Sequence, residues 1–225
     1  MSVTPIARGS KLAIGINAFT LPAEQQPALV ETLTAINREI LAHKYPMIVS
    51  ANFHRATDAP IIINYNQYTD RALGQFLRTQ ANVAPLMKRT HDLSDKHEIR
   101  WYEIADVLTA SGPEDRIEVR DDRGTIGVVG IFTVAADKQG ELLALLKRYG
   151  EALKEASAPG FIGIATHRGY QPAHVASYEQ WASADAYRQA VASGPSAELL
   201  KQIRTMAEVA ELHPYDVLSV TRFDA

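Results

Sequence analysis

The chain has 225 residues, of which 46% are hydrophobic and 22% charged, with a formal net charge of −3. These proportions are those of an ordinary folded protein, so they exclude disordered, collagen-like and coiled-coil classes. The sequence contains no cysteine, which excludes disulfide frameworks, cysteine zinc sites, iron–sulfur clusters and thiol nucleophiles. Because the chain has no basic block, we expect no nucleic-acid partner.

The N-terminal residues lack a long apolar segment. No other stretch approaches the ~18 consecutive apolar residues that a membrane span needs. The sequence therefore predicts a cytoplasmic protein without a membrane partner.

Hydrophobic periodicity predicts a β-α-β-β-α-β order in the first half of the chain. The expected elements are strands over 12–19, 47–53, 61–68 and 99–107, a helix over 24–42 and a second helix from Asp70. A polar stretch rich in turn-forming residues follows. It predicts a linker at 111–122 between an N-terminal domain, 1–110, and a C-terminal domain, 123–225.

The same order of elements recurs in the second half. The expected strands cover 126–134, 161–166, 175–181 and 216–220. Asp137 is expected to cap the first helix of this half and Ser183 the second, while Pro195 opens a further helical turn.

A sequence duplication explains the recurrence. Comparing 19–107 with the residues 113 positions later gives 17 identities in 89 pairs, against about 6 expected by chance. The β-α-β-β-α-β order is the ferredoxin-like module. The predicted fold class is therefore α+β, with two tandem ferredoxin-like domains that cover each other's apolar sheet faces as an intramolecular pseudo-dimer. Association into a further homodimer is left open.

The third strand of the first copy carries amides and a large aromatic side chain on one face. Strand alternation places Asn64, Asn66 and Tyr68 together, and Trp181 stands at the equivalent of Tyr68 in the second copy. An amide can hydrogen-bond an oxyanion, and an aromatic side chain can stack on an aromatic ligand. The pattern fits a ligand pocket, and it also fits packed core residues whose polar groups are satisfied internally.

Residues 63–68 and 176–187 resemble the Asn-Tyr-X-Gln-Trp segment of the antibiotic biosynthesis monooxygenase family, in particular its quinone-forming members of the actinorhodin type. The resemblance covers about 11–108 and 125–220. It implies a dimeric α/β-barrel and oxygenation of an electron-rich phenolic ring by O2, without flavin, haem or metal. In that chemistry the deprotonated substrate reduces O2, while the protein orients the ring and stabilises the oxyanion.

The resemblance also implies which residues would act. By their matching positions, the catalytic residues would be Asn64, Tyr68, Trp181 and Tyr187. The substrate would be contacted by Phe53, His54, Gly74, Lys88, His167 and Lys201. The two lysines stand where the family has an arginine, and Gly74 replaces a tyrosine and would enlarge the first pocket. A structural role at a strand end and a role in proton transfer both stay open for the repeated histidine.

Neither copy holds the family's complete set, because Ser177 replaces the asparagine in the second copy and Gly74 the tyrosine in the first. Three interpretations remain. The first pocket acts with altered aromatic residues, the second acts without the amide, or the protein has another ligand or reaction. The first interpretation is favoured.

Metal and haem chemistry are not expected. None of the seven histidines forms a His-x-x-x-His or His-Glu-x-x-His motif, so no metal site is predicted. Haem degradation is a neighbouring activity in the superfamily, and Asn17 resembles an asparagine of those relatives. However, Arg78 and Val191 stand where the haem-ligating histidine would be.

The resulting hypothesis is a cofactor-independent monooxygenase that oxidises a phenolic polycyclic substrate to a quinone with O2. The substrate would be an anthrone- or hydroquinone-like compound such as a polyketide. Two other classes stay open: a non-catalytic protein that binds small aromatic molecules, and a cyclase or isomerase that needs no O2.

Overall fold

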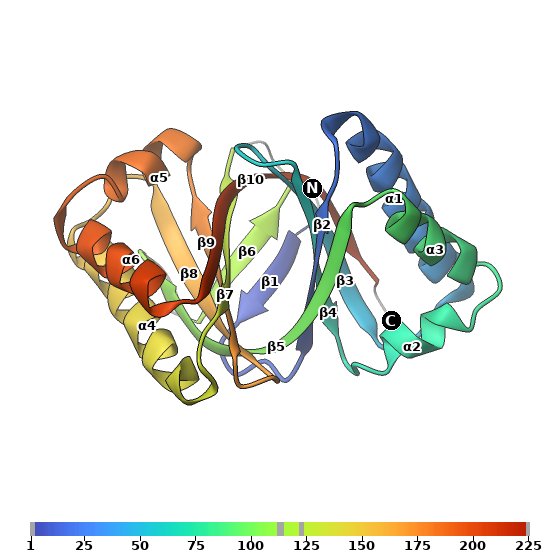
Figure 1. The fold of residues 1–225 in the computed structure, drawn as a ribbon, viewed down its shortest axis with the longest axis horizontal. Coiled ribbons are helices and arrows are strands. Elements are labelled where there is room, and N and C mark those ends of the chain that lie inside the picture. Colours follow the sequence, from blue (N-terminus) through green and yellow to red (C-terminus); the bar gives the residue numbers. More distant parts are fainter. Residues whose placement is uncertain (1–2, 112–114, 122–123, 224–225) are drawn as a thin grey trace.

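The computed structural model describes residues 3–111, 115–121 and 124–223. Eight strands form a closed barrel at the centre, and two groups of helices lie on opposite outer sides of it (Figure 1). None of the helices in these ranges is long and apolar enough to cross a membrane.

The N-terminal copy supplies four barrel strands and the helices α1 to α3. Its elements are β2 (Ala13–Thr20), η1 (Ala23–Gln25), α1 (Gln26–His43), β3 (Ile48–Ala56), β4 (Ile61–Tyr68), α2 (Leu73–Arg78), α3 (Ala84–Asp92) and β5 (Lys96–Thr109). The helix expected from Asp70 is thus two short helices, and Asp70 precedes them.

The C-terminal copy repeats this arrangement. Its elements are β7 (Ile126–Thr133), η2 (Ala136–Lys138), α4 (Gln139–Glu155), β8 (Phe161–Gly169), β9 (His174–Trp181), α5 (Ala184–Ala190), α6 (Gly194–Met206) and β10 (Val209–Arg222). Each of its barrel strands begins and ends 113 positions after its counterpart in the first copy, which is the offset of the sequence repeat.

The strands run in the order β10-β3-β4-β2-β5-β8-β9-β7 around the barrel. All neighbours are antiparallel, and the last strand of each copy pairs with the second strand of the other, β5 with β8 and β10 with β3. These crossed pairings close the barrel without free edges. The predicted α+β fold of two tandem ferredoxin-like domains, joined as an intramolecular pseudo-dimer, is confirmed.

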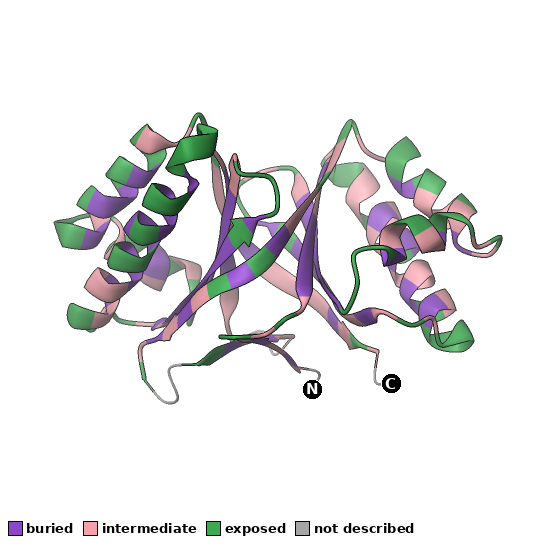
Figure 2. Ribbon diagram, turned by 90° about the horizontal axis from the view of Figure 1, so that it is seen from below, coloured by how far each residue is buried: buried purple, intermediate pink, exposed green. Residues whose placement is uncertain are grey.

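One feature of the barrel was not predicted. Strand β1 (Val3–Ala7) pairs with β6 (Arg116–Arg120), and this two-stranded sheet lies across one end of the barrel (Figure 2). Its apolar side chains Ile6, Ile117 and Val119 are buried in the core inside the barrel. Strand β6 occupies part of the predicted linker, of which 112–114 and 122–123 lie outside the described residues. The domain boundaries at 110 and 123 stay a prediction.

Of the two predicted helix caps, Ser183 is confirmed and Asp137 is not. The Ser183 hydroxyl accepts a hydrogen bond from the backbone N–H of Ala186 at 3.1 Å and caps α5, as predicted. Asp137, by contrast, lies inside the 3₁₀ turn η2, so α4 begins two residues later and without a side-chain cap. The prediction of Asp137 as the cap was wrong because the turn extends the chain into the helix directly.

Candidate functional site

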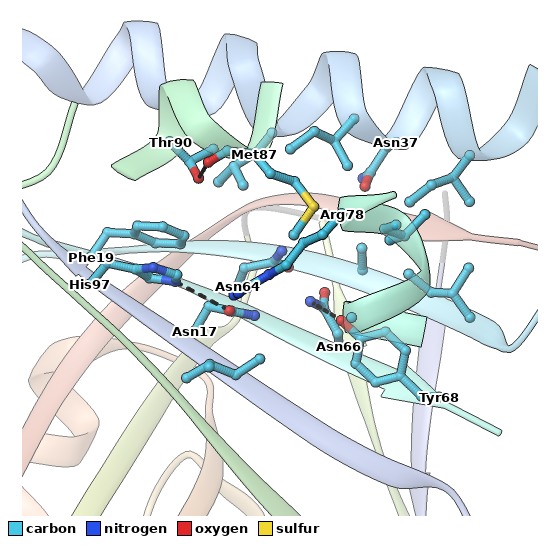
Figure 3. A pocket seen from close by; sticks show the side chains of 18 of the residues that line it. Asn17, Phe19, Asn37, Asn64, Asn66, Tyr68, Arg78, Met87, Thr90 and His97 are labelled. Atoms are coloured by element: carbon cyan, nitrogen blue, oxygen red, sulfur yellow. Dashed lines mark hydrogen bonds between the residues drawn. The ribbon is translucent and has the colours of Figure 1, made fainter. Parts of the chain in front are cut away.

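A cavity of about 100 Å³ lies in the N-terminal copy, between the outer face of the sheet and α1, α2 and α3 (Figure 3). Its apolar walls come mainly from the helices and include Leu33, Ile36, Ile40, Leu77 and Met87. Its polar groups come mainly from the strands and include Asn17, Asn64, Asn66, Tyr68 and His97. An apolar space with a few convergent polar groups is typical of a small-molecule site.

The floor of the cavity is formed by β4. The alternation of this strand turns Asn64, Asn66 and Tyr68 into the cavity, as predicted, and turns Tyr65 into the core of the barrel. The Nδ2 group of Asn66 donates to the Tyr68 hydroxyl at 2.7 Å. The amide oxygens Oδ1 of Asn64 and Asn66 are both buried and have no hydrogen-bond partner. A bare buried acceptor is costly, so both oxygens favour a hydrogen-bond donor within the cavity.

Trp101 closes one side of the cavity beside Tyr68. The two rings lie 5.1 Å apart between centroids. Both cross the backbone of Gly15 on β2, where an added Cβ would stand 2.9 Å from the Tyr68 ring and 3.3 Å from Trp101. A glycine is therefore needed at this position for the two rings to pack as they do. Trp101 also lies 3.7 Å from the place of a Cβ on Gly74, and so occupies part of the room that this glycine leaves.

Two histidines line the other end of the cavity. The ring of His97 stacks on Phe19 with centroids 4.4 Å apart. Its Nε2 lies 3.4 Å from Asn17 Oδ1, and its Nδ1 lies 3.0 Å from Nδ1 of His91. Burial lowers the pKa of His97 to about 4, and the nearby His91 and Arg78 act in the same direction. His97 is consequently neutral at pH 7, with one ring nitrogen able to donate and the other able to accept.

The cavity opens toward solvent at α2 and α3. Arg78 and His91 are exposed there, whereas Asn64 and Asn66 at the floor are buried. The side chain of Arg78 points from α2 toward Asn64 (Figure 3). The site therefore has a polar floor, apolar walls and a cationic mouth.

The equivalent position in the C-terminal copy is filled. The counterparts of Ile36, Ile48, Tyr68 and Gly74, offset by 113, are larger side chains: Tyr149, Phe161, Trp181 and Tyr187. All four are buried in one apolar core cluster. The counterpart of Asn17 is Gly130, where an added Cβ would lie 2.5 Å from the Phe132 ring.

A buried carboxyl group replaces Asn66 in that filled core. Glu179 accepts hydrogen bonds from Trp181 Nε1 at 2.9 Å and from the Tyr149 hydroxyl at 3.2 Å. Burial raises the pKa of Glu179 to about 7, although both hydrogen bonds oppose the shift. Trp181 and Tyr187 thus belong to a packed network, in which their rings lie 5.6 Å apart.

The other residues singled out from the sequence lie outside the cavity lining. Phe53 is buried in the apolar core between the sheet and the helices of the N-terminal copy. The side chain of Lys88 is 75% exposed and pairs with Asp92 at 2.6 Å. The side chain of Lys201 is 78% exposed on α6.

His54 and His167 lie on the opposite face of their strands, inside the barrel. His54 Nε2 is 3.0 Å from the Tyr178 hydroxyl, and His167 Nε2 is 2.8 Å from the Tyr65 hydroxyl. Burial lowers the pKa of each imidazole to about 4. The structure therefore brings together Asn64, Tyr68 and Gly74 out of the ten predicted positions.

Sequence reasoning missed Trp101 and the role of the His91–His97 pair. Strand alternation on β5 places His97, Ile99 and Trp101 on one face, and this signal could have shown that the final strand lines the same space as β4. In the described parts of the chain, no three histidine, aspartate or glutamate side chains gather as metal ligands.

The fold and the C-terminal sequence both have relatives. Residues 125–205 match the family model described as antibiotic biosynthesis monooxygenase. No curated protein matches the chain. The solved structure of an anthrone oxidase-like protein is similar with a TM-score of 0.85 and 21% identity, covering 99% of this chain and 98% of that one.

Two further solved structures are similar at 10% identity, and both are described as candidate monooxygenases. The one from Fusobacterium nucleatum has a TM-score of 0.64 and covers 94% of each chain. The one from Lactobacillus acidophilus has a TM-score of 0.60, covering 96% of this chain and 98% of that one. At these identities, the likenesses establish the shared fold.

The molecule is thus a duplicated ferredoxin-like barrel with a small cavity in one copy. Residues 125–205 match the model of the antibiotic biosynthesis monooxygenase family. The family match lies in the copy whose core is filled, and the cavity lies in the other copy.

Proposed function

We propose that the chain is a cofactor-independent monooxygenase whose active site is the N-terminal cavity, where a phenolic ring is oxidised to a quinone by O2. The family match at 125–205 supports the reaction class. The observation that carries the choice of site is the pair of buried, unpartnered acceptors Asn64 Oδ1 and Asn66 Oδ1. Ring hydroxyl groups are donors that would complete both of them.

Tyr68 has a complementary role. Its hydroxyl accepts from Asn66, which leaves its proton available for a ligand oxygen. Burial raises the pKa of Tyr68 above its ordinary value, so the phenol stays protonated. Tyr68 and the Asn64 amide are therefore suited to stabilise the phenolate that forms when the substrate loses its proton.

The reaction balances without a further oxidant or reductant. The CH2 group opposite the ring carbonyl first loses a proton, which gives the phenolate. O2 then forms a bond to this carbon; when the O–O bond breaks, the carbon loses its second hydrogen, one oxygen atom becomes the new carbonyl oxygen and the other leaves as water. The deprotonated ring provides the electrons. The His91–His97 pair lies at the open end of the cavity and offers a route by which the first proton reaches solvent.

The size of the cavity limits how much of the substrate it encloses. An apolar cavity of roughly 150 Å³ holds one benzene ring, and this cavity measures about 100 Å³. We propose that the edge of the substrate that carries its oxygen atoms enters and that the rest of a polycyclic ring system extends through the mouth. Met87 at the helical wall is a flexible side chain that can adjust to such a ring.

The remaining sequence-based assignments change accordingly. We propose that Trp181 and Tyr187 fill the C-terminal core, and that His54 and His167 join the two copies. Lys88 and Lys201 have no part in catalysis in this proposal.

Oxygen-electrode measurements test the reaction class. With 1,8-dihydroxyanthrone as the substrate and a metal chelator present, the protein should consume one O2 for each quinone formed, above the rate of spontaneous oxidation. A requirement for added flavin, binding without O2 consumption, or anaerobic conversion of the substrate would each contradict the proposal. The second outcome indicates a binding protein, and the third a cyclase or isomerase.

A further inference from the structure

The mouth of the cavity carries a cation without a counter-ion. Among the residues that line the cavity, Arg78 is the one with a permanent charge, and none of the lining residues is acidic. In the described ranges, Arg78 forms no ion pair and no hydrogen bond with a carboxylate. Lys88 on the neighbouring helix is instead neutralised by Asp92. An arginine is thus kept unpaired where a ligand would pass.

The surroundings of Arg78 make the mouth favourable for an anion. Arg78 and His91 both lower the pKa of His97, which means that these groups act on the same small region. No lining carboxylate offsets this effect. An incoming negative charge would therefore meet an uncompensated guanidinium beside two imidazoles that can donate hydrogen bonds.

The floor of the cavity needs hydrogen-bond donors. Asn64 and Asn66 are 8% and 3% exposed, and their Oδ1 atoms lack partners. The floor and the mouth therefore favour different groups on one ligand. The floor requires one or more hydroxyl groups, and the mouth requires an anion.

We infer that the cavity binds a hydroxylated aromatic carboxylate, with its hydroxyl groups on Asn64 and Asn66 and its carboxylate on Arg78. The inference rests on the proposed site and names the class of substrate. A single planar guanidinium matches the two oxygens of a carboxylate through paired hydrogen bonds. A phosphate would place about two negative charges against this one permanent cation.

A matched pair of small ligands tests the inference by isothermal titration calorimetry. 3,5-Dihydroxybenzoate and resorcinol carry the same two hydroxyl groups, and only the first has a carboxylate. At pH 7.5 and low salt, the protein should bind 3,5-dihydroxybenzoate at least tenfold more tightly than resorcinol. Arg78→Gln should remove this preference and leave resorcinol binding unchanged.

Arg89→Gln is the matched control, because Arg89 is an exposed arginine of α3 outside the cavity lining. It removes the same net charge and should keep the preference. The inference is overturned if Arg78→Gln retains the preference, or if Arg89→Gln loses it to the same extent. Equal binding of the two ligands by the unmodified protein would also overturn it.

Failure of this inference can be distinguished from failure of the proposed monooxygenase function. Loss of the preference in Arg78→Gln without any O2 uptake on phenols would support the ligand class and contradict the monooxygenase. O2 uptake on phenols, together with a preference for 3,5-dihydroxybenzoate that persists in Arg78→Gln, would support the monooxygenase and contradict the ligand class.

Discussion

The Nε2 atom of His54 lies 3.0 Å from the hydroxyl oxygen of Tyr178 at the centre of the barrel, although 124 residues separate the two in sequence. His54 Nδ1 lies 3.1 Å from the carbonyl oxygen of Asn52. The Nδ1–H group therefore donates there, which makes Nε2 the acceptor of the Tyr178 proton. The duplication repeats the bond between Tyr65 and His167. Each bond joins one copy to the other, so the repeated histidines hold the pseudo-dimer together.

Tyr178→Phe should destabilise the protein by about 1–3 kcal/mol, because it leaves Nε2 of His54 buried without a donor. Urea unfolding monitored by circular dichroism measures the change. Tyr170→Phe is the control, since Tyr170 is exposed and its ring, which Arg71 covers at 4.0 Å, is retained. A Tyr178→Phe variant as stable as the control would contradict a stabilising role for this bond between the copies.

His54 should also make the protein sensitive to acid. Burial lowers the pKa of His54 from 6.5 to about 4, so the unfolded chain binds a proton at a pH where the folded chain does not. Stability is therefore lost as the pH falls below 6.5, by about 2 kcal/mol for this histidine at pH 5.

The comparison of the wild type with His54→Gln isolates this effect, because contributions such as that of Glu179 are common to both. The variant should be less stable at pH 7.5, and the difference should shrink by about 2 kcal/mol at pH 5. Urea unfolding at the two pH values measures it. A difference independent of pH would mean that His54 is not held neutral by burial.

Two glycines report the different packing of the two copies. Gly74→Ala adds a Cβ at 3.7 Å from Trp101, an ordinary contact, and should stabilise the protein by up to about 1 kcal/mol through helix propensity. Gly130→Ala adds one at 2.5 Å from Phe132 and should destabilise it by about 1–3 kcal/mol through overpacking. Thermal unfolding of both variants gives the comparison. Equal destabilisation would contradict an open first copy and a filled second copy.

Ligand binding should be reported by one of the two tryptophans. Trp101 lines the cavity, whereas Trp181 is fully buried in the filled core. Titration with resorcinol should change the fluorescence of Trp181→Phe, which retains Trp101. The fluorescence of Trp101→Phe, which retains Trp181, should stay unchanged. The reverse pattern would place the ligand in the C-terminal copy.

The sequence was sufficient for the two ferredoxin-like copies because the repeat and the strand alternation can be recognised directly in it, and the family resemblance implied the barrel that they form. The offset of 113 predicted which strands of the two copies correspond to each other. Alternation on β4 placed Asn64 and Tyr68 on the helix-covered face. Strands β1 and β6 were not predicted because they are short and pair with each other although they lie far apart in the sequence. Their apolar side chains are buried against one end of the barrel, and short sequence patterns do not show that this end needs a cover.

The site was predicted less well for a similar reason. Whether an aromatic residue lines a cavity or fills it depends on the side chains opposite. Trp181 packs against Phe161 and Tyr187, whereas Tyr68 packs against Trp101, and Gly74 stands at the position equivalent to Tyr187. Lys88 matched the position of a family arginine, yet its place on α3 gives it Asp92 as a partner. Among the residues that line the cavity, the permanent cation is Arg78, on a different helix.

The location of the active site is tested most directly by one pair of substitutions at equivalent positions of the two copies. Asn64→Ala removes the amide at the cavity floor and should lower kcat/KM for 1,8-dihydroxyanthrone about 10²-fold. Ser177→Ala makes the matching change in the filled copy and should leave kcat/KM unchanged. Unchanged turnover in Asn64→Ala, or loss of turnover in Ser177→Ala alone, would contradict the assignment of the N-terminal cavity.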